Sequence, residues 1–259
     1  MINISIILPT INEEENLKFL IPDIFDELET IEILEFEILV VDDGSTDNTK
    51  ELIKKLKNKY TNLEIIERSK APSLPMSILD GINSSKYQYV MWLDADGSMP
   101  AYVVKQLVEK QISHLESVII GSRFVAGGGY KGVEKDKNTN MMTQIYNIYN
   151  SEDSILAVYL SKLFNKFLSR ILNLKVKDLT SGFIIGKKSN FNSKVFETAN
   201  YGDYFINLVV DLQLNFINCI EIPYYCETRK FGNSKTGSNY IELFKKGIPY
   251  LKLAYKLRK

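Results

Sequence analysis

Two aspartates, Asp94 and Asp96, follow directly on the apolar run of residues 89–93. An apolar run without polar alternation predicts a strand buried on both faces, and the abrupt change in polarity marks its carboxyl end. In open α/β sheets, ligands bind outside the carboxyl ends of the strands. Carboxylates at alternate positions share one face and can hold one cation, and oxygen ligands without His or Cys favour Mg²⁺ or Mn²⁺ over Zn²⁺. The alternative is a solvated turn, because an Asp-x-Asp pair alone is common.

The composition limits the class of protein. The chain has 259 residues, of which 45% are hydrophobic and 25% charged, as in a soluble globular protein with one large α/β domain. Lys+Arg and Asp+Glu both number 32, so no net charge attracts nucleic acid and we expect no such partner. Cys219 and Cys226, in a chain without a signal-peptide pattern, favour reduced thiols and a cytoplasmic location. No apolar run approaches the roughly 18 to 20 residues that span a bilayer.

Predicted strands and helices alternate in the first half of the chain. Apolar runs predict further strands at 2–8, 36–41, 63–67 and 117–121, and apolar periodicity predicts helices at 17–28, 52–60, 75–82 and 100–112. This alternation is typical of right-handed βαβ units and of a Rossmann-like, mainly parallel sheet between helices. Pro9 is expected to end the first strand, since it cannot donate to a ladder. Gly44 is expected to permit a tight turn, with Ser45 or Thr46 capping the next helix.

The alternation stops at residues 126–154, where three glycines precede a polar segment rich in Lys and Asn. A connection this long within a compact domain is usually a functional lid or disordered, so we expect a mobile loop. Helices are predicted again at 155–172 and 204–214, and a strand at 217–222. No linker divides the chain, so we expect one domain over residues 1–245 and a basic tail over 246–259.

The tail is compatible with two arrangements. From Lys245 to Lys259 there are six basic residues, no acidic ones and several interleaved apolar ones. This pattern suits an interfacial helix on an anionic membrane, interrupted near Pro249. It equally describes a terminal helix packed on the domain with a solvated basic face.

Six motifs occur in order along residues 2–245. They are Leu-Pro-Thr at 8–10 with Asn-Glu-Glu-Glu-Asn at 12–16, Val-Asp-Asp-Gly-Ser-Thr-Asp at 41–47, Asp-Ala-Asp at 94–96, Gly-Ser-Arg-Phe at 121–124, Asp-Leu-Thr-Ser-Gly-Phe at 178–183, and Arg229 with Gly-Asn-Ser-Lys at 232–235. One such motif would be weak, but six in this order are specific. Together they resemble the family 2 inverting glycosyltransferases of the GT-A fold, especially the polyprenyl (dolichyl) phosphate mannose or glucose synthase branch.

The resemblance implies a nucleotide-diphosphate sugar donor, a UDP- or GDP-hexose. It places four residues near base and ribose, namely Pro9, Thr10, Glu13 and Asp43. It places Asp94 and Asp96 at the metal and diphosphate, where Mg²⁺ or Mn²⁺ would stabilise the charge of the leaving group. Three further residues resemble the family's positive groups around phosphates, with surface ion pairs as the alternative: Arg123, Arg229 and Lys235.

Asp203 resembles the acidic residue before the family's late helix, which acts as the base in members that accept on a hydroxyl. The resemblance thus makes Asp203, with Asp96, a catalytic candidate. The alternative for Asp203 is a helix cap. Asp178 is an acceptor-side candidate, or a structural residue that holds the Thr-Ser-Gly turn.

The sequence departs from the family pattern in two places. Residues 68–75 lack the usual glycine-rich run on the donor side. Ala157 stands where the phosphate-accepting branch usually has a basic residue, about one helical turn before Ser161. That departure points away from polyprenyl phosphate as the acceptor, although other basic residues could supply the charge: Lys131, Lys135, Lys137 and Arg170.

We therefore expect hexosyl transfer to a saccharide or lipid-linked acceptor in glycan or cell-envelope polysaccharide synthesis, by an enzyme in the cytoplasm or peripheral on the inner face of the membrane. The first alternative is a polyprenyl phosphate hexose synthase. A sugar-phosphate nucleotidyltransferase is expected to have a glycine-rich loop after the first strand. This chain has Pro-Thr-Ile-Asn-Glu-Glu there, which argues against that class. A non-catalytic binding protein is disfavoured by the intact carboxylates Asp94, Asp96 and Asp203.

Overall fold

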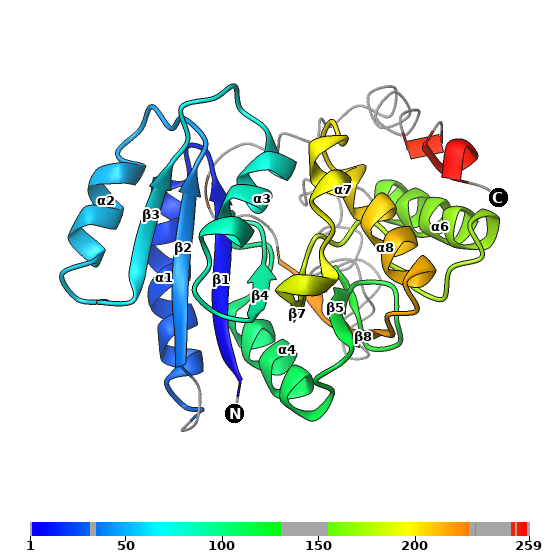
Figure 1. Ribbon diagram of the computed structural model, residues 1–259, viewed down its shortest axis with the longest axis horizontal. Coiled ribbons are helices and arrows are strands. Elements are labelled where there is room, and N and C mark those ends of the chain that lie inside the picture. The colour runs from blue at the N-terminus through cyan, green and yellow to red at the C-terminus, as the bar shows by residue number, and fades with distance from the viewer. Residues whose placement is uncertain are drawn as a thin grey trace, which may run out of the picture.

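The computed structural model describes residues 2–31, 35–130, 155–227, 231, 250–251 and 253–257. Its main feature is a seven-stranded sheet of order β3-β2-β1-β4-β7-β5-β8 (Figure 1). The strands are β1 (Asn3–Thr10), β2 (Glu35–Asp42), β3 (Leu63–Glu67), β4 (Tyr89–Trp92), β5 (Val118–Ser122), β7 (Ile184–Lys187) and β8 (Cys219–Pro223). The strand pairs are parallel except those of β7, which is antiparallel to β4 and β5. The predicted mainly parallel α/β sheet is confirmed.

Helices cover both faces of this sheet. They are α1 (Glu14–Leu28), α2 (Thr49–Leu56), α3 (Leu74–Ser84), α4 (Ala101–Ser113), α6 (Ile155–Ile171), α7 (Ser193–Glu197) and α8 (Tyr204–Leu214), with a 3-10 turn η1 (Lys188–Asn190). Because side chains alternate along a strand, Ile6 packs in one core cluster with α1 and α4, and Ile7 in another with α3 and α8. Each fully buried aliphatic side chain stabilises the fold by ~1.5–3 kcal/mol, so the two clusters hold the sheet between its helix layers.

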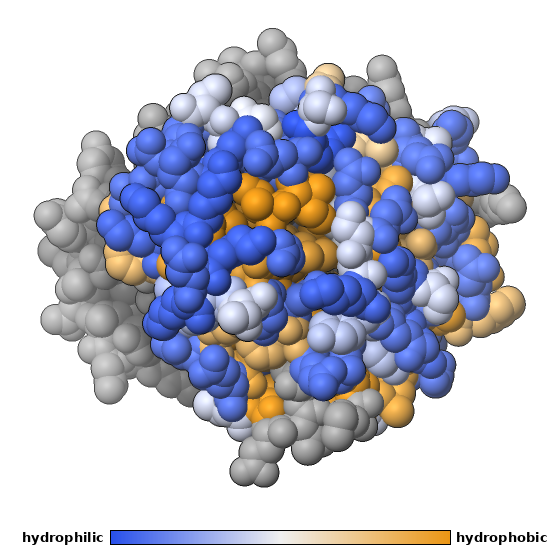
Figure 2. All heavy atoms as spheres, turned by 60° about the vertical axis from the view of Figure 1, so that its left-hand side comes forward, coloured by the Kyte–Doolittle hydropathy of each residue, from blue (hydrophilic) through white to orange (hydrophobic). Residues whose placement is uncertain are grey.

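The side chains on one side of the surface are mostly hydrophilic. Figure 2 brings forward the side of the molecule that bears α2 and β3. Hydrophilic side chains cover most of this side, and hydrophobic ones are visible in the gaps between them.

Pro9 does not end the first strand, contrary to the sequence prediction. β1 continues to Thr10, and Pro9 lies in register with Val41 of β2. On its other side, β1 pairs with β4 only over residues 4–7. Pro9 therefore has a neighbouring strand on one side only, so its missing N–H interrupts no ladder on the other side.

The turn after β2 is tight, as predicted, but the helix that follows is not capped as expected. Gly44 has φ +92°, a conformation that favours glycine. Helix α2 begins after Asn48, beyond the predicted caps Ser45 and Thr46. Asp47 instead accepts a hydrogen bond from the backbone N–H of Thr49, at 3.1 Å.

The sheet topology brings the sequence motifs to one edge. The parallel strands β1, β2, β3, β4, β5 and β8 all end at the same edge of the sheet. β7 begins at this edge because it is antiparallel to its neighbours, so residues 178–183 lie there too. The loops that carry five of the six motifs therefore meet above one edge, where ligands bind in open α/β sheets.

Two features of the sheet were not predicted from the sequence. The antiparallel strand β7 stands between β4 and β5 in the middle of the main sheet. A separate two-stranded sheet pairs β6 (Gly129–Tyr130) with β9 (Tyr225–Cys226) above the end of β5. The rest of the expected mobile loop, residues 131–154, lies outside the described residues.

The described part of the tail packs on the domain. Tyr250 makes an edge-to-face contact with Phe164 of α6, with ring centroids 6.2 Å apart, and Ala254 is 2% exposed. The packed arrangement is therefore the one found for residues 250–251 and 253–257. Within the described ranges, no helix is long and apolar enough to cross a membrane.

Candidate active site

Asp94 and Asp96 lie on a turn beyond the end of β4. Strand alternation was expected to place the two carboxylates on one face. The strand ends at Trp92, however, so turn geometry places them instead. Asp96 Oδ1 accepts a hydrogen bond from the backbone N–H of Ser98 at 2.9 Å, and Gly97 has φ +76°. Asp96 is 5% exposed, whereas Asp94 is half-buried. The turn thus fixes one carboxylate firmly at the edge of the sheet.

This turn suits a cation that is shared with a ligand. Among the described residues, no group of three or more His, Cys, Asp or Glu side chains gathers as a metal site. At this turn, Asp94 and Asp96 offer two carboxylates. Mg²⁺ is typically held by one or two carboxylates together with substrate phosphates, so this donor set fits a divalent cation bound with a diphosphate.

The loops after β1 and β2 are joined into one unit. The backbone N–H of Asn12 donates to Ser45 Oγ at 2.8 Å, and the N–H of Thr46 donates to Asn12 Oδ1 at 2.7 Å. Asn12 has φ 55°, and in this conformation its backbone N–H and its side-chain Oδ1 both face the second loop. Thr10 contributes as well, because its carbonyl accepts from the N–H of Asp43 at 2.8 Å. Pro9 and Thr10 at the end of β1, and Glu13 and Asp43 in the loops that follow β1 and β2, thus lie on segments that hydrogen bonds hold together.

Asp43 is held by two groups from the loop after β3. One carboxylate oxygen pairs with the guanidinium of Arg68, and the other accepts from the backbone N–H of Ser73 at 2.6 Å. Arg68 also contacts Asp80 at 2.7 Å, and its side chain is 3% exposed. This loop is the one that lacks the family's glycine-rich run. The contact of Arg68 with Asp43 was not predicted. The position of Arg68 directly after β3 was the only feature of the sequence that could have indicated it.

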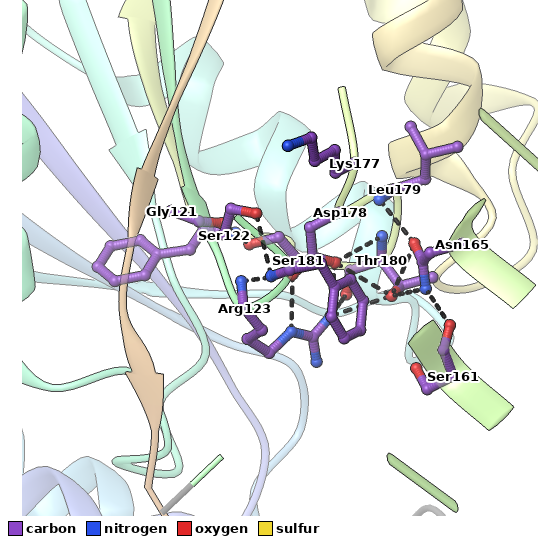
Figure 3. Close-up of polar contacts among 12 residues, drawn as sticks. Gly121, Ser122, Arg123, Ser161, Asn165, Lys177, Asp178, Leu179, Thr180 and Ser181 are labelled. Atoms are coloured by element: carbon purple, nitrogen blue, oxygen red, sulfur yellow. Dashed lines mark hydrogen bonds and ion pairs between the residues drawn. The ribbon is translucent and has the colours of Figure 1, made fainter. Parts of the chain in front are cut away.

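Arg123 is bound to Asp178 across two loops, as Figure 3 shows. Its Nε and Nη2 atoms donate to the two carboxylate oxygens, both at 2.8 Å, and Nη2 also donates to the carbonyl of Thr180 at 2.9 Å. Burial alone would lower the pKa of Arg123, but the Asp178 carboxylate holds this pKa above its ordinary value. The charge of Arg123 is thus balanced by a fully buried aspartate, in a buried ion pair and not in the surface pair that the alternative described.

Helix α6 supports the same turn. Asn165 Oδ1 accepts from the backbone N–H of Leu179 at 2.7 Å, and Asn165 Nδ2 donates to Thr180 Oγ1 at 3.2 Å (Figure 3). Glu221 of β8 accepts from the backbone N–H of Asp178 at 3.0 Å. The turn at residues 178–181 is therefore held by α6, by β8 and by Arg123 in the loop after β5, which agrees with the structural alternative for Asp178.

Asp203 stands at the start of α8 and faces back toward the preceding turn. Its Oδ1 accepts from the backbone N–H groups of Asn200 and Tyr201, at 3.1 and 2.8 Å. Asp203 occupies the N-cap position of α8, as the alternative predicts, but its side chain makes no capping hydrogen bond to the helix. The next residue, Tyr204, accepts a hydrogen bond from Trp92 Nε1 at 3.1 Å. Because Trp92 ends β4, this contact places Asp203 at the same edge as Asp94 and Asp96.

Two tyrosines that the sequence analysis did not select lie beside these carboxylates. Burial, with the charge of Asp94, raises the pKa of Tyr204, so this phenol stays protonated. Burial, with the charges of Asp203 and Tyr201, raises the pKa of Tyr250 to about 12. A Cβ atom at Gly202 would lie 2.4 Å from the Tyr250 hydroxyl oxygen, so the tail reaches the residue next to Asp203.

Of the remaining predicted residues, Arg170 lies in the described part of the chain and the others do not. Arg229 and Lys235 lie outside the described residues, as do Lys131, Lys135 and Lys137. Arg170 is exposed on α6.

A family model identifies the chain. The model of the Glycosyl transferase family 2 matches residues 5–193, which run from within β1 past the end of β7 and include the carboxylate turn. The chain belongs to this family. The match decides against the nucleotidyltransferase alternative.

Two curated relatives of this family 2 chain carry the same name. A dolichol-phosphate mannosyltransferase of Pyrococcus furiosus is 28% identical over 258 residues, which cover 99% of this chain and 64% of the relative. The Saccharomyces cerevisiae dolichol-phosphate mannosyltransferase is 30% identical over 135 residues, covering 52% of this chain and 49% of that protein. The chain thus spans less than two thirds of the length of these relatives.

Solved structures show the same fold. Glucosyl-3-phosphoglycerate synthase from Mycobacterium tuberculosis, in complex with uridine diphosphate, superposes with a TM-score of 0.61 at 14% identity. The alignment covers 99% of this chain and 80% of that one. The same enzyme with Mn²⁺, uridine diphosphate and glucosyl-3-phosphoglycerate gives a TM-score of 0.61 at 14% identity, again covering 99% and 80%. The predicted GT-A fold is confirmed.

Proposed function

We propose that this chain transfers a hexosyl group, with inversion, from a nucleotide-diphosphate sugar to a saccharide or lipid-linked acceptor. The observation that carries the proposal is the carboxylate turn of Asp94 and Asp96 at the sheet edge, beside the joined loops that hold Glu13 and Asp43. When the bond between the sugar and the diphosphate breaks, the nucleoside diphosphate leaves with negative charge, which a divalent cation stabilises. Asp94 and Asp96 would hold that cation, and the loops of β1 and β2 would hold the nucleoside.

The names of the relatives support this donor. The solved relative was crystallised with uridine diphosphate and Mn²⁺, and the curated relatives are named as mannosyltransferases. A UDP- or GDP-hexose with Mg²⁺ or Mn²⁺ is therefore the donor class we propose.

A second candidate acceptor is a polyprenyl phosphate. The name dolichol-phosphate mannosyltransferase, shared by both curated relatives, favours it. Arg170, which is exposed on α6, is the described residue among the cations that could supply charge to such an acceptor. The two acceptors require different chemistry at Asp203, and this difference separates them experimentally.

Thermal shift with a panel of nucleotide sugars tests the donor. We expect UDP- or GDP-hexoses to raise the melting temperature in the presence of Mn²⁺, and chelation with EDTA to remove the effect. A ligand at 100 times its dissociation constant stabilises the folded state by ~2.7 kcal/mol, which is readily measured. No stabilisation by any nucleotide sugar with Mn²⁺ or Mg²⁺ would contradict the proposal.

A surface on α6 supports peripheral membrane association. Tyr159, Leu163 and Phe167 follow each other at intervals of four and are 57%, 44% and 52% exposed. Three exposed basic residues flank this stripe, namely Lys162, Lys166 and Arg170. Helix α6 contains no acidic residue. An apolar stripe with basic flanks fits the headgroup region of an anionic bilayer.

The packed tail adds to this surface. Tyr250 contacts Phe164 of α6, while Leu251 and Tyr255 are 41% and 80% exposed. Because α6 also supports the turn at residues 178–181, a membrane bound here would lie next to the acceptor side of the site. We therefore propose that α6 and the tail together dock on an anionic membrane.

Replacing Lys162, Lys166 and Arg170 by Gln should weaken binding to vesicles that contain anionic phospholipid by ~10²-fold, because each basic residue near such a surface contributes ~1 kcal/mol. Co-sedimentation measures the loss. The matched control replaces Lys54, Lys55 and Lys59, which are exposed on and after α2, and should bind as the unmodified chain does. Equal binding of both variants, or equal binding to neutral vesicles, would rule out this surface.

A further inference from the structure

The loop between β3 and α3 is closed at both of its ends by one carboxylate, that of Asp43. One of its oxygens pairs with the guanidinium of Arg68, where the loop leaves β3. The other accepts from the backbone N–H of Ser73 at 2.6 Å, where the loop enters α3. Residues 69–72, between these two ends, are exposed. The course of the loop therefore depends on how Arg68 and Ser73 are held at Asp43.

Helix α3 holds the same guanidinium. Arg68 Nε donates to Asp80 Oδ2 at 2.7 Å, and Arg68 Nη1 donates to Ser77 Oγ at 3.3 Å. Ser77 and Asp80 are three residues apart on α3, so their side chains lie on one face of the helix. Arg68 thus connects a face of α3 to Asp43 at the end of β2.

Asp80 is the accessible member of this chain of contacts. The side chains of Arg68 and Asp43 are 3% and 8% exposed, whereas that of Asp80 is 32% exposed. The guanidinium is planar and donates in fixed directions, so the bond from Nε to Asp80 sets the orientation in which Nη1 reaches Asp43. Water competes little for the buried contact. A change at Asp80 therefore alters how Arg68 is held without opening the core.

We propose that Asp80 is a positioning residue for the part of the site that binds the nucleoside of the donor. Asp80 orients Arg68, Arg68 holds Asp43, and Asp43 closes the loop beside the loops that follow β1 and β2. Residues 68–75 lack the family's glycine-rich run, and these side-chain contacts hold the loop in its place. The inference rests on the proposed function, because its effect on binding requires a nucleotide donor.

Calorimetry with UDP and with GDP, each in the presence of Mn²⁺, tests this role. For the nucleotide that binds, Asp80→Ala should weaken affinity about fivefold, because it removes one charge-assisted hydrogen bond that orders the site. The Mn²⁺ concentration for half-maximal binding should stay unchanged, since Asp80 acts on the nucleoside side and not at the carboxylate turn. In an Arg68→Gln background, Asp80→Ala should cost less than about twofold, because contacts that act as a unit are not additive.

Glu64→Ala is the matched control. Glu64 lies near the start of β3 and pairs with Lys57 at 2.6 Å, and its side chain is 42% exposed. Its replacement therefore also removes one partly exposed ion pair, but away from the loop, and should leave nucleotide affinity unchanged. Asp80→Asn keeps the shape of the side chain and an oxygen that can accept from Arg68 Nε, so it should restore most of the affinity.

Limited trypsin digestion tests the loop without a ligand. Lys70 is exposed within the loop, and a loop that is held in place resists cleavage after this residue. Asp80→Ala should be cut there at least several-fold faster than Glu64→Ala. Adding Asp80→Ala to Arg68→Gln should give no further acceleration, since the two residues act in one chain of contacts.

The outcomes separate this inference from the proposed donor. Unchanged cleavage after Lys70 in Asp80→Ala would overturn the holding of the loop. Unchanged nucleotide affinity, an altered Mn²⁺ requirement, or equal losses with and without Arg68 would overturn the positioning role. If neither nucleotide binds the unmodified chain while cleavage accelerates as expected, the proposed donors fail and the holding of the loop by Asp80 stands.

Discussion

Asp96→Asn is expected to reduce hexosyl transfer by at least ~10²-fold, because a metal ion that stabilises a leaving diphosphate supplies several kcal/mol and each ~1.4 kcal/mol is tenfold in rate. Asparagine keeps the shape of the side chain and an Oδ1 atom that accepts from the Ser98 N–H, so the turn should remain. Only the charge is lost. Turnover with the donor found by thermal shift, and calorimetry of Mn²⁺-dependent nucleotide binding, measure the effect.

Asp26→Asn is the control for this change. Asp26 is an exposed aspartate on α1, and its substitution should leave turnover and metal dependence unaltered. Both variants should melt within a few degrees of the unmodified chain. If Asp96→Asn bound the nucleotide with unchanged affinity and unchanged Mn²⁺ dependence, Asp96 would not be a metal ligand.

The sequence was sufficient to predict most of the sheet because local sequence patterns indicate most of its strands. Apolar runs bounded by polar turns correspond to β2, β3 and β5 within one residue or two at each end. The motif positions then follow from topology, since parallel strands share one carboxyl edge. Asp43 and Asp94 could therefore be expected near one edge without knowledge of any contact between them, whereas Asp203, which precedes α8, was expected there only from the family resemblance.

Contacts between residues far apart in the chain could not be predicted from the sequence. β7 has an apolar run of ordinary length, and nothing local indicates that it inserts antiparallel between β4 and β5. The pairing of Arg123 with Asp178 depends on two loops that are 55 residues apart. The role of Arg68 at Asp43 depends on a loop whose sequence looked like a departure from the family. Each of these contacts is set by tertiary packing, which periodicity does not report.

The acceptor can be decided at Asp203, because the two candidate acceptors differ in their need for a base. A lipid phosphate is already ionised and needs cations that position it, whereas a sugar hydroxyl is neutral and needs a carboxylate that removes its proton. Within the described residues, the hydrogen bonds that the Asp203 carboxylate accepts all fall on Oδ1. Its Oδ2 atom is therefore the one we assign to proton removal.

Asp203→Asn should lower transfer to a saccharide hydroxyl by ~10²–10⁴-fold, the usual effect of removing a general base, with donor affinity preserved. The asparagine Oδ1 still accepts from the N–H groups of Asn200 and Tyr201, so the turn before α8 should persist. Asp211→Asn, near the other end of α8, is the control and should transfer normally. Initial rates are measured with a lipid-linked saccharide and, separately, with polyprenyl phosphate as acceptor. Near-full transfer to polyprenyl phosphate by Asp203→Asn would refute the hydroxyl acceptor and establish the lipid phosphate in its place, because an ionised acceptor has no proton for Asp203 to remove.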